Sequence, residues 1–468
     1  MTIQFCGAAR QVTGTKHLIT TEKGTKILLD CGLFQGIETQ ELNQNFGFEP
    51  SEIDYVVLSH AHIDHAGLLP RLVAKGFSGS IYCTPATADL CQIMLMDSAH
   101  IQETDVERIN ERRKKRGETE LESLYTSEDV EETLKRFIEV DYHQIFWLNN
   151  NEVSGQFTDT GHILGSAAVH LTIQEGNQTK RITFSGDIGR PNDKILRSPE
   201  PFPQADVLIC ESTYGDRLHE PEPDMKAHLL RIVRDTCVVR GGKLIIPAFA
   251  VDRTQELIYA LDQLVAEGRL PAIKVFIDSP LAVKATAIMK AHEECFNPEI
   301  LAYLKKDGDA FGFPNLVYVS DVEQSKAINN LREPCIIISA SGMAEAGRIK
   351  HHIKNNIKDP NSTILIVGYC SPNSLGGALK RGDEEVRIFG ENFVVKARVE
   401  VMDSFSAHAD YEEMIGYLKC QNPSQVQQLF LVHGDYDTQL VFKEKLLKEG
   451  FPNVQIPDMF EKVTVISF

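Results

Sequence analysis

Three histidines and an aspartate are crowded into six consecutive positions, in the segment HAHIDH at residues 60–65. An apolar run at residues 55–58 precedes this segment and a helical pattern at residues 66–77 follows it. The pattern predicts that the four side chains lie where a buried strand ends and a helix begins, where open α/β sheets carry their active sites. Imidazole and carboxylate ligands without a thiolate favour a catalytic zinc site over a structural one. Four donors exceed the need of one such ion, so the segment predicts two metal ions.

A dinuclear site needs further ligands from elsewhere in the chain. Three candidates share one local pattern, an apolar strand that ends in a turn of small residues: His162, Asp187 and His433. Taken singly, each is more typical of a capped turn or a buried core histidine than of a metal ligand. Together they complete the expected number of ligands, and a carboxylate such as Asp187 can bridge two ions about 3.5–4 Å apart.

The length of the chain and its strand pattern predict two α/β domains. A chain of 468 residues is too long for one compact core. After residue 211, apolar strands repeatedly run into Gly, Ser or Pro turns followed by helices, which is typical of a parallel sheet with crossover helices. The charged segment at residues 98–137 predicts an exposed helical excursion with a solvated face. Earlier short strands, bounded by Gly, Asp or Pro, are expected at residues 25–30, 54–58, 181–185 and 206–210.

Composition limits the class of protein. The formal net charge of -18 argues against a generally basic surface that binds a long polyanion, although it leaves room for a local basic cleft. The ten cysteines are scattered without a CxxC pair and are expected to be reduced. The N-terminus lacks the apolar core of a signal peptide, and no apolar run is long enough to span a bilayer. We therefore expect a cytoplasmic protein with no membrane partner.

The motifs carry a resemblance to a known family. HAHIDH, with Asp30 in LLDCG, His162 and Asp187, resembles the metallo-β-lactamase superfamily. ESTYGD at Glu211, SFSAHAD at His408 and LVHGD at His433 resemble its β-CASP group of nucleic-acid-cleaving enzymes. In overall plan the chain is most similar to bacterial relatives of the nuclease subunit of the eukaryotic pre-mRNA 3'-end cleavage machinery.

This resemblance implies an α/β fold with two domains. The metallo-β-lactamase αββα sandwich is expected at residues 1–211 and 405–468, and an inserted β-CASP α/β domain, a parallel sheet with crossover helices, at residues 212–404. It also implies a catalytic site between the two domains that holds two zinc ions, with manganese as an alternative metal. One ion would be bound by His60, His62, His162 and Asp187, and the other by Asp64, His65, Asp187 and His433.

The resemblance also assigns roles beside the metals. Asp30 is expected to orient the ligands from behind. Glu211 and His408 correspond to the pair that protonates the leaving oxygen, while Asp64 and Asp187 take part in catalysis through the ions that they hold. The alternative for His408 is a third ligand to the second metal ion.

The implied activity is a zinc-dependent ribonuclease that cuts single-stranded RNA and leaves 5'-phosphate and 3'-hydroxyl ends, with endonucleolytic cleavage favoured. The alternatives are a 5'-to-3' exoribonuclease, a metal-dependent hydrolase of a small thioester or lactam, and a non-catalytic scaffold. RNA or DNA preference, the natural transcript, the physiological metal and the oligomeric state, a homodimer included, stay open. Substrate phosphates are expected at the turns of the insertion and at the turn of residues 404–406, on Arg253, Ser339, Ser341, Lys350, Lys380, Arg381 and Ser406. The turns at residues 339–343 and 404–406 are equally compatible with simple strand-helix turns.

Overall fold

The chain folds into two compact units. The computed structural model describes residues 1–36, 39–149, 151–219, 224–368, 370–402 and 406–465. Unit 1 comprises Met1–Leu218 and Ala407–Phe468, and unit 2 comprises His219–Ser406. The first division thus falls at residues 218/219, beside the expected boundary at 211/212. The second expected boundary, between residues 404 and 405, lies outside the described residues.

Unit 1 contains two seven-stranded sheets. In order across the first sheet the strands are β22 (Lys462–Thr464), β1 (Thr2–Phe5), β2 (His17–Thr20), β3 (Lys26–Leu29), β4 (Tyr55–Val57), β5 (Ser80–Cys83) and β6 (Phe137–Glu139). Across the second sheet they are β21 (Val454–Gln455), β20 (Gln428–Val432), β11 (Val207–Glu211), β10 (Gln178–Phe184), β9 (Ala167–Glu175), β8 (Val153–Asp159) and β7 (Phe146–Leu148). Strand β20, from the C-terminal part of the chain, therefore lies inside the second sheet, next to β11.

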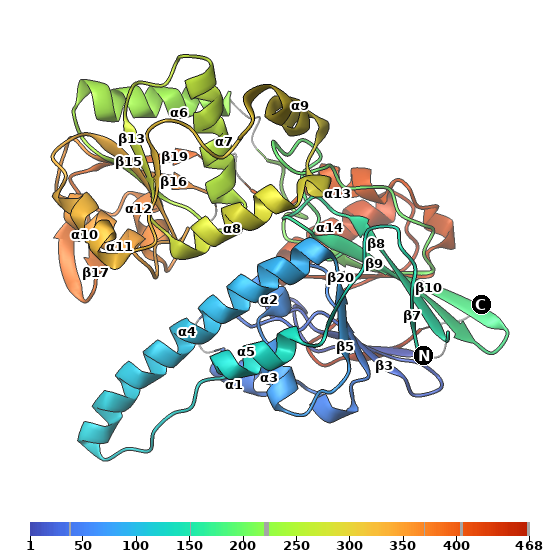
Figure 1. Cartoon of the computed structure of the whole chain (residues 1–468). Helices are drawn as coiled ribbons and strands as arrows, with labels where there is room; N and C mark the ends of the chain where they lie inside the picture. Colours follow the sequence, from blue (N-terminus) through green and yellow to red (C-terminus); the bar gives the residue numbers. More distant parts are fainter. Residues whose placement is uncertain (37–38, 150, 220–223, 369, 403–405, 466–468) are drawn as a thin grey trace. The chain divides into compact units, whose positions relative to one another are not determined.

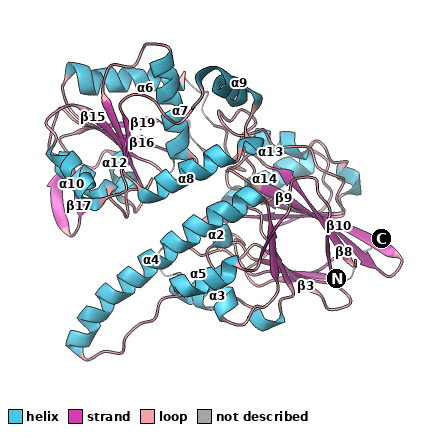
Figure 2. Ribbon diagram, in the orientation of Figure 1, coloured by secondary structure: helices cyan, strands magenta, loops and turns pink. Residues whose placement is uncertain are grey.

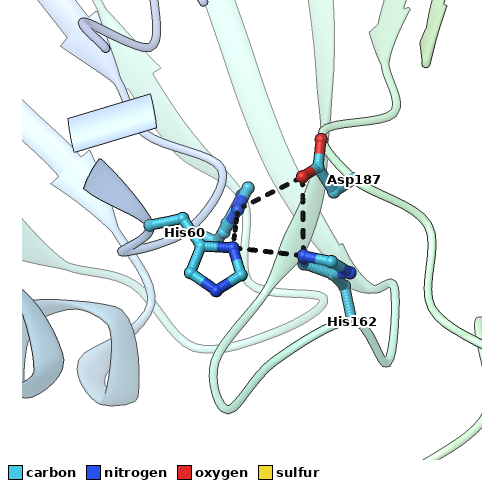
Figure 3. A group of neighbouring side chains, drawn as sticks. His60, His162 and Asp187 are labelled. Carbon is cyan, nitrogen blue, oxygen red and sulfur yellow. Dashed lines mark hydrogen bonds and ion pairs between the residues drawn. The ribbon is translucent and has the colours of Figure 1, made fainter. Parts of the chain in front are cut away.

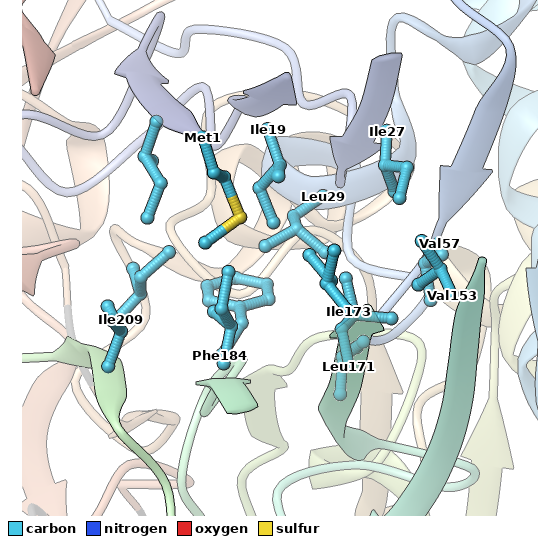
Figure 4. Packing of buried hydrophobic residues seen from close by; sticks show 14 of the residues in the cluster. Met1, Ile19, Ile27, Leu29, Val57, Val153, Leu171, Ile173, Phe184 and Ile209 are labelled. Atoms are coloured by element: carbon cyan, nitrogen blue, oxygen red, sulfur yellow. The ribbon is translucent and has the colours of Figure 1, made fainter. Parts of the chain in front are cut away.

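The main core of unit 1 lies between the two sheets. Buried side chains of both sheets form one hydrophobic cluster, in which Figure 4 shows Ile19, Leu29 and Val57 of the first sheet opposite residues of the second such as Leu171 and Phe184. Burial of each such side chain contributes about 1.5–3 kcal/mol. Packing of the two sheets stabilises both, because either sheet alone would expose an apolar face to water.

Helices cover the outer faces of unit 1 (Figures 1 and 2). Met414, Leu418, Phe442 and Leu446 of the C-terminal helices pack against the second sheet. Among the described residues, no helix combines the length and the apolar character that crossing a membrane requires. The helices of unit 1 are α1 (Gln40–Gln44), α2 (Ile63–Ala66), α3 (Leu69–Ala74), α4 (Pro85–Arg116), α5 (Ser127–Leu134), α13 (Tyr411–Leu418) and α14 (Tyr436–Lys448).

The charged segment expected as an exposed helical excursion comprises mainly the second half of α4, a loop and α5. This helix of 32 residues starts at the N-cap Thr84, whose side chain accepts a hydrogen bond from the Thr87 N–H. It ends where Gly117 adopts a φ of 68°, a left-handed conformation that glycine takes without strain. Its basic residues gather in the last turn, where they complement the helix dipole.

Unit 2 is built on one six-stranded parallel sheet, as the sequence predicts. Its order is β14 (Leu316–Tyr318), β13 (Lys274–Ile277), β15 (Cys335–Ser339), β12 (Leu244–Pro247), β16 (Thr363–Val367) and β19 (Arg398–Met402). The antiparallel hairpin of β17 (Glu385–Ile388) and β18 (Glu391–Val394) is separate from this sheet. The helices are α6 (Met225–Val233), α7 (Arg253–Ala266), α8 (Pro280–Ala291), α9 (Pro298–Asp307), α10 (Val322–Asn330), α11 (Ile349–Asn356) and α12 (Leu375–Arg381).

The direction of the strands in unit 1 decides where its polar turns gather. In the first sheet β3, β4 and β5 run parallel, and in the second β10, β11 and β20 run parallel. Parallel strands bring their carboxyl ends to the same edge of a sheet. Asp30, His60, Asp187 and His433 closely follow these strands, and Glu211 is the last residue of β11. These side chains are therefore gathered at the carboxyl edges.

Asp159, the last residue of β8, makes the stability of unit 1 depend on pH. It is 3% exposed, and burial raises the pKa of its carboxyl to about 7 although it accepts a hydrogen bond from the Gly161 N–H. Above pH ~4 the unfolded chain releases this proton while the folded chain keeps it, so the stabilising contribution is complete below pH ~4 and is lost as the pH rises to about 7.

We expect Asp159→Asn, which keeps an acceptor for Gly161, to remove this loss. The unfolding free energy of the variant minus that of the wild type should rise by on the order of 2–4 kcal/mol from pH 4 to pH 8. Urea denaturation at both pH values measures this change. The matched control is Asp54→Asn, because the exposed Asp54 carboxylate also accepts a backbone hydrogen bond, from Lys26. An equal difference between Asp159→Asn and wild type at both pH values would contradict the assignment.

Candidate metal centre and active site

Three imidazoles and one carboxylate oxygen of unit 1 converge on a single point. His62 Nδ1 lies 3.1 Å from His60 Nε2 and 3.2 Å from His162 Nε2. Asp187 Oδ2 lies 3.6 Å from His60 Nε2 and 3.4 Å from His162 Nε2. Figure 3 shows His60, His162 and Asp187 pointing toward one another from separate turns of the chain. These four residues form the first ligand group, and each offers one atom to a common centre.

A second group lies on the other side of the same aspartate. Asp187 Oδ1 lies 3.2 Å from His65 Nε2 and 3.6 Å from His433 Nδ1. The other ring nitrogen of His433, Nε2, lies 3.3 Å from Asp64 Oδ2. Asp64, His65 and His433 likewise offer three atoms that lie within 4.8 Å of one another. Asp187 thus faces both groups, one oxygen to each.

The spacing of the first group fits a tetrahedral zinc ion. Zinc–nitrogen and zinc–oxygen bonds of roughly 2.0–2.2 Å at tetrahedral angles separate neighbouring ligand atoms by about 3.3 Å. The four distances between 3.1 and 3.6 Å in this group lie around that value. Asp187 Oδ1 is buried and has no well-aligned hydrogen-bond donor among the described residues, which is the condition of a carboxylate oxygen that binds a cation. The donor sets therefore suit two divalent metal ions.

Burial and charge keep the first group ready for a metal. Burial, with the nearby charge of His65, lowers the pKa of His60 well below its usual value, and burial lowers the pKa of His62 to about 4. Burial, followed by the charge of His408, lowers the pKa of His162 in the same direction. Imidazole binds a metal in its neutral form, so these histidines need no deprotonation at neutral pH.

His65 differs from the other ligand histidines. Burial works against its protonation, but the carboxylates of Asp187 and Asp30 outweigh burial and raise the pKa of His65 well above its usual value. Asp30 Oδ2 lies 2.6 Å from His65 Nδ1, which leaves Nε2 directed at Asp187. Such an excess of carboxylate around one imidazole marks a place that a bound cation would balance.

Asp30 fixes two ligand histidines through one hydrogen-bond network. Its Oδ1 accepts a hydrogen bond from the Ser59 N–H at 2.7 Å, and its Oδ2 accepts one from the Ser59 hydroxyl at 2.7 Å. The same hydroxyl lies 3.0 Å from His60 Nδ1. Asp30 therefore has the geometry expected of a residue that orients the ligands from behind.

The backbone around Asp30 holds the HAHIDH turn closely. The Cys31 N–H donates to His65 O at 2.7 Å, and the Thr15 N–H donates to Asp64 O at 2.9 Å. A Cβ on Gly32 would lie 1.6 Å from Asp64 O, so only glycine fits beside this turn.

The buried Glu211 and the partly exposed His408 form an acid–base pair next to the two groups. His408 Nδ1 lies 3.1 Å from Glu211 Oε1 and 3.9 Å from Asp187 Oδ2. Burial opposes the charged form of His408, but the charge of Glu211 and the hydrogen bond to it outweigh burial and raise the pKa of His408 to about 9. His408 is then protonated at neutral pH and can donate a proton. His408, Asp187 and His433 also lie close enough to share a metal, the alternative that the sequence leaves open.

Thr213 links this pair to the second metal group, and sequence reasoning did not find it. Its hydroxyl donates to Glu211 Oε2 at 2.6 Å and lies 3.0 Å from His433 Nδ1. The signal was a hydroxyl two residues after Glu211 in ESTYGD, just as Ser59 directly precedes His60. Glu211 is held further by the Ile188 N–H, which donates to its Oε1 at 2.6 Å.

The residues expected to bind substrate phosphates differ in what the structure offers. Ser339 is 1% exposed and its hydroxyl donates to Asp278 O, while Arg253 is 6% exposed and pairs with Glu256. Burial and existing partners count against both as phosphate contacts. Ser341 is partly exposed and exchanges hydrogen bonds with the backbone of Ala346.

The cations near the end of α12 are better exposed. Lys380 and Arg381 are exposed there, although Arg381 pairs with Asp383 at 2.9 Å. Lys350 is partly exposed and donates to Glu345 O, and Ser406 is partly exposed. Ser404, in the same expected turn as Ser406, lies outside the described residues.

Comparison with protein families agrees with this geometry. Residues 17–224 match the model of the metallo-beta-lactamase superfamily, residues 254–379 that of the Beta-Casp domain, and residues 393–457 that of the Zn-dependent metallo-hydrolase RNA specificity domain. The chain therefore belongs to the metallo-β-lactamase superfamily, in its β-CASP group of metal-dependent hydrolases. The resemblance and the fold class inferred from the motifs are confirmed.

Individual relatives extend over nearly the whole chain. Ribonuclease TTHA0252 of Thermus thermophilus is 34% identical over 444 residues, which cover 95% of each chain. An RNase J-like protein of Methanocaldococcus jannaschii is 29% identical over 449 residues, again 95% of each chain. Transcription termination factor FttA of Methanosarcina mazei is 30% identical over 441 residues, which are 92% of this chain but 66% of that protein.

We expect Asp30→Asn to weaken metal binding while the fold is kept. Loss of the charge behind His65 should lower the affinity for zinc by about 10- to 100-fold. Competition with a chelator, followed by elemental analysis of metal per chain, measures this change. Asp206→Asn is the control, because Asp206 pairs with Arg181 at the opposite end of β11 and should leave the affinity unchanged. Two ions retained by Asp30→Asn with wild-type affinity would rule out the orienting role.

Proposed function

We propose that this protein is a zinc-dependent ribonuclease that hydrolyses phosphodiester bonds of single-stranded RNA by internal cleavage, leaving 5'-phosphate and 3'-hydroxyl ends. The observation that carries this proposal is the Asp187 carboxylate, which turns one oxygen to His60 and His162 and the other to His65 and His433. A single carboxylate shared in this way suits a pair of metal ions, and paired ions are the usual centre for displacement at phosphorus.

The proposed ligand sets follow the two groups. One zinc ion is held by His60, His62, His162 and Asp187, and the other by Asp64, His65, Asp187 and His433. Manganese is the alternative metal, since imidazole and carboxylate ligands accept both. When bound, two such ions supply Lewis acidity at the phosphoryl group and activate a water as nucleophile.

His408 is the proposed proton donor in this reaction. The buried Glu211 holds His408 Nδ1, so Nε2 is the nitrogen that can reach the leaving 3'-oxygen, and the raised pKa keeps the ring charged. Thr213 and the Ile188 N–H fix Glu211, so the pair is oriented before the substrate binds. Asp30 orients His65 and, through Ser59, His60.

RNA is the substrate that the comparisons favour. One relative is named a ribonuclease and another RNase J-like, and residues 393–457 resemble an RNA specificity domain. These names count against a small thioester or lactam as substrate. The proposed phosphate contacts remain groups of unit 2 that are partly or fully exposed: Ser341, Lys380, Arg381 and Ser406. The proposed domains remain residues 1–211 with 405–468, and residues 212–404. The ten free cysteines agree with a cytoplasmic location.

We expect His408→Ala to lose cleavage while it keeps both metal ions. Removal of a general acid should lower kcat by about 10²–10⁴-fold. The test compares single-stranded RNA and the matching DNA, each with 5'-phosphate or 5'-hydroxyl ends, with metal content determined on the same samples. The control is His143→Ala, because His143 pairs with Glu200 at 3.0 Å in unit 1 but its ring is mostly exposed.

Four outcomes separate the candidate activities and the candidate roles of His408. Internal cuts irrespective of the 5' end support the endoribonuclease, whereas stepwise release that requires a 5'-phosphate supports the 5'-to-3' exoribonuclease. Loss of one metal ion in His408→Ala makes His408 a ligand instead of the proton donor. A fully metallated wild type that cuts no nucleic acid refutes the proposed function.

A further inference from the structure

A second surface of interest lies wholly within unit 2, on one side of helix α11 and the β17–β18 hairpin. Lysines 350, 354 and 358 recur every four residues and so share one face of the helix and its extension. Two aromatic rings of the hairpin, Phe389 and Phe393, lie against these lysines. The α11–hairpin surface consists of Lys350, His351, Lys354, Lys358 and Phe389, while Phe393 is 7% exposed and belongs to the hydrophobic core of unit 2.

The rings and the ammonium groups interleave on this surface. Phe389 has the ammonium groups of Lys350 and Lys354 at 5.2 and 5.8 Å from its centroid, and Phe393 has those of Lys354 and Lys358 at 5.3 and 5.0 Å. These are cation–π distances. Lys354 also pairs with Glu391 at 3.3 Å, whereas Lys358 has no ion-pair partner among the described residues. The surface therefore retains positive charge on a chain whose net charge is -18.

Phe389 is not placed to fill a core. It is the first residue of the hairpin turn, has a φ of 52°, and is 47% exposed. Asn and Gly are the residues that such turns favour, and a bulky residue at positive φ is strained. The ring lies over His351, with the centroids 4.6 Å apart and the planes inclined by 35°. An exposed aromatic ring supported from behind by another ring is a platform on which a further planar group can stack.

The immediate surroundings of His351 agree with a positive surface. Its partial burial, followed by the charges of His352, Lys354 and Lys350, lowers the pKa of His351. The imidazole is then neutral at physiological pH and serves as a stacking partner rather than as an anion contact.

We propose that the α11–hairpin surface binds single-stranded RNA, with a base stacked on Phe389 and backbone phosphates held by Lys350 and Lys358. Aromatic rings interleaved with cations suit single strands, because each base offers a π-face and each nucleotide a phosphate. An acidic protein would satisfy the lysines but would not use the exposed ring. That the strand is RNA rather than DNA rests on the proposed ribonuclease function. The surface then anchors the substrate in addition to the metal centre, and favours long RNA over short RNA.

Photo-crosslinking with a 4-thiouridine RNA tests the contact without relying on cleavage. We expect the wild-type chain to crosslink at Phe389 or its neighbours on the surface, as located by mass spectrometry of digested peptides. Phe389→Ala should lose this crosslink and Phe389→Trp should retain it. Trp147→Ala is the control, because Trp147 is 54% exposed on β7 of unit 1. Crosslinks that form only outside residues 349–394 would overturn the proposal.

Steady-state kinetics supply the second readout. For a 30-nucleotide RNA, Phe389→Ala should raise KM by about 5- to 150-fold, the loss of one base stack, with kcat unchanged, and Phe389→Trp should restore KM. For a trinucleotide neither parameter should change. Replacing Lys350 and Lys358 by Gln should reduce the slope of log KM against log salt by roughly 1.4, about 0.7 for each lost phosphate contact. The matched control replaces Lys305 and Lys306 of α9, two exposed lysines of the same unit.

The outcomes distinguish this inference from the function on which it rests. Cleavage with the same KM in Phe389→Ala, the lysine variant and the wild type overturns the inference, leaves the ribonuclease intact and makes an acidic protein the better occupant. A crosslink at Phe389 without cleavage of any RNA refutes the ribonuclease and supports the binding surface.

Discussion

The arrangement of unit 1 is constrained by the Asp187 carboxylate, which two groups of side chains share. One oxygen must face His60 and His162 while the other faces His65 and His433. His60 and His65 share one turn, but His162 and His433 come from turns far from it in the chain. The parallel strands of the two sheets bring these turns together at their carboxyl edges. The tight approach of Gly32 to the HAHIDH turn shows how little freedom is left in that arrangement.

Much of the site could be predicted from the sequence because its ligands follow apolar strands directly. A His or Asp within a few residues of the end of an apolar strand can be recognised from the local sequence, as at His60, Asp187 and His433. Ser59 and Thr213 could not be recognised, since hydroxyl residues in turns are common and only the folded network gives them partners. Arg253 is a different case: its charge suggested a phosphate contact, which stays a prediction, and in the folded chain it is buried and paired with Glu256.

The fold was predictable for a related reason. The alternation of buried strands and helices after residue 211 is regular, and unit 2 is accordingly one parallel sheet. The hairpin of β17 and β18 was less visible, because its surface depends on Lys350 and Lys354 in a helix more than thirty residues earlier in the chain. Patterns within one segment reveal elements, whereas surfaces that two segments share appear only once both are folded.

The position of β20 has a consequence for the order of synthesis. Its partner β11 is made before the whole of unit 2, and all five of its residues are buried in the finished protein. During synthesis on the ribosome, one edge of β11 therefore stays unpaired until residues 428–432 emerge. The growing chain is thus most exposed to aggregation during translation of unit 2, and a chaperone that covers strand edges would act in that interval.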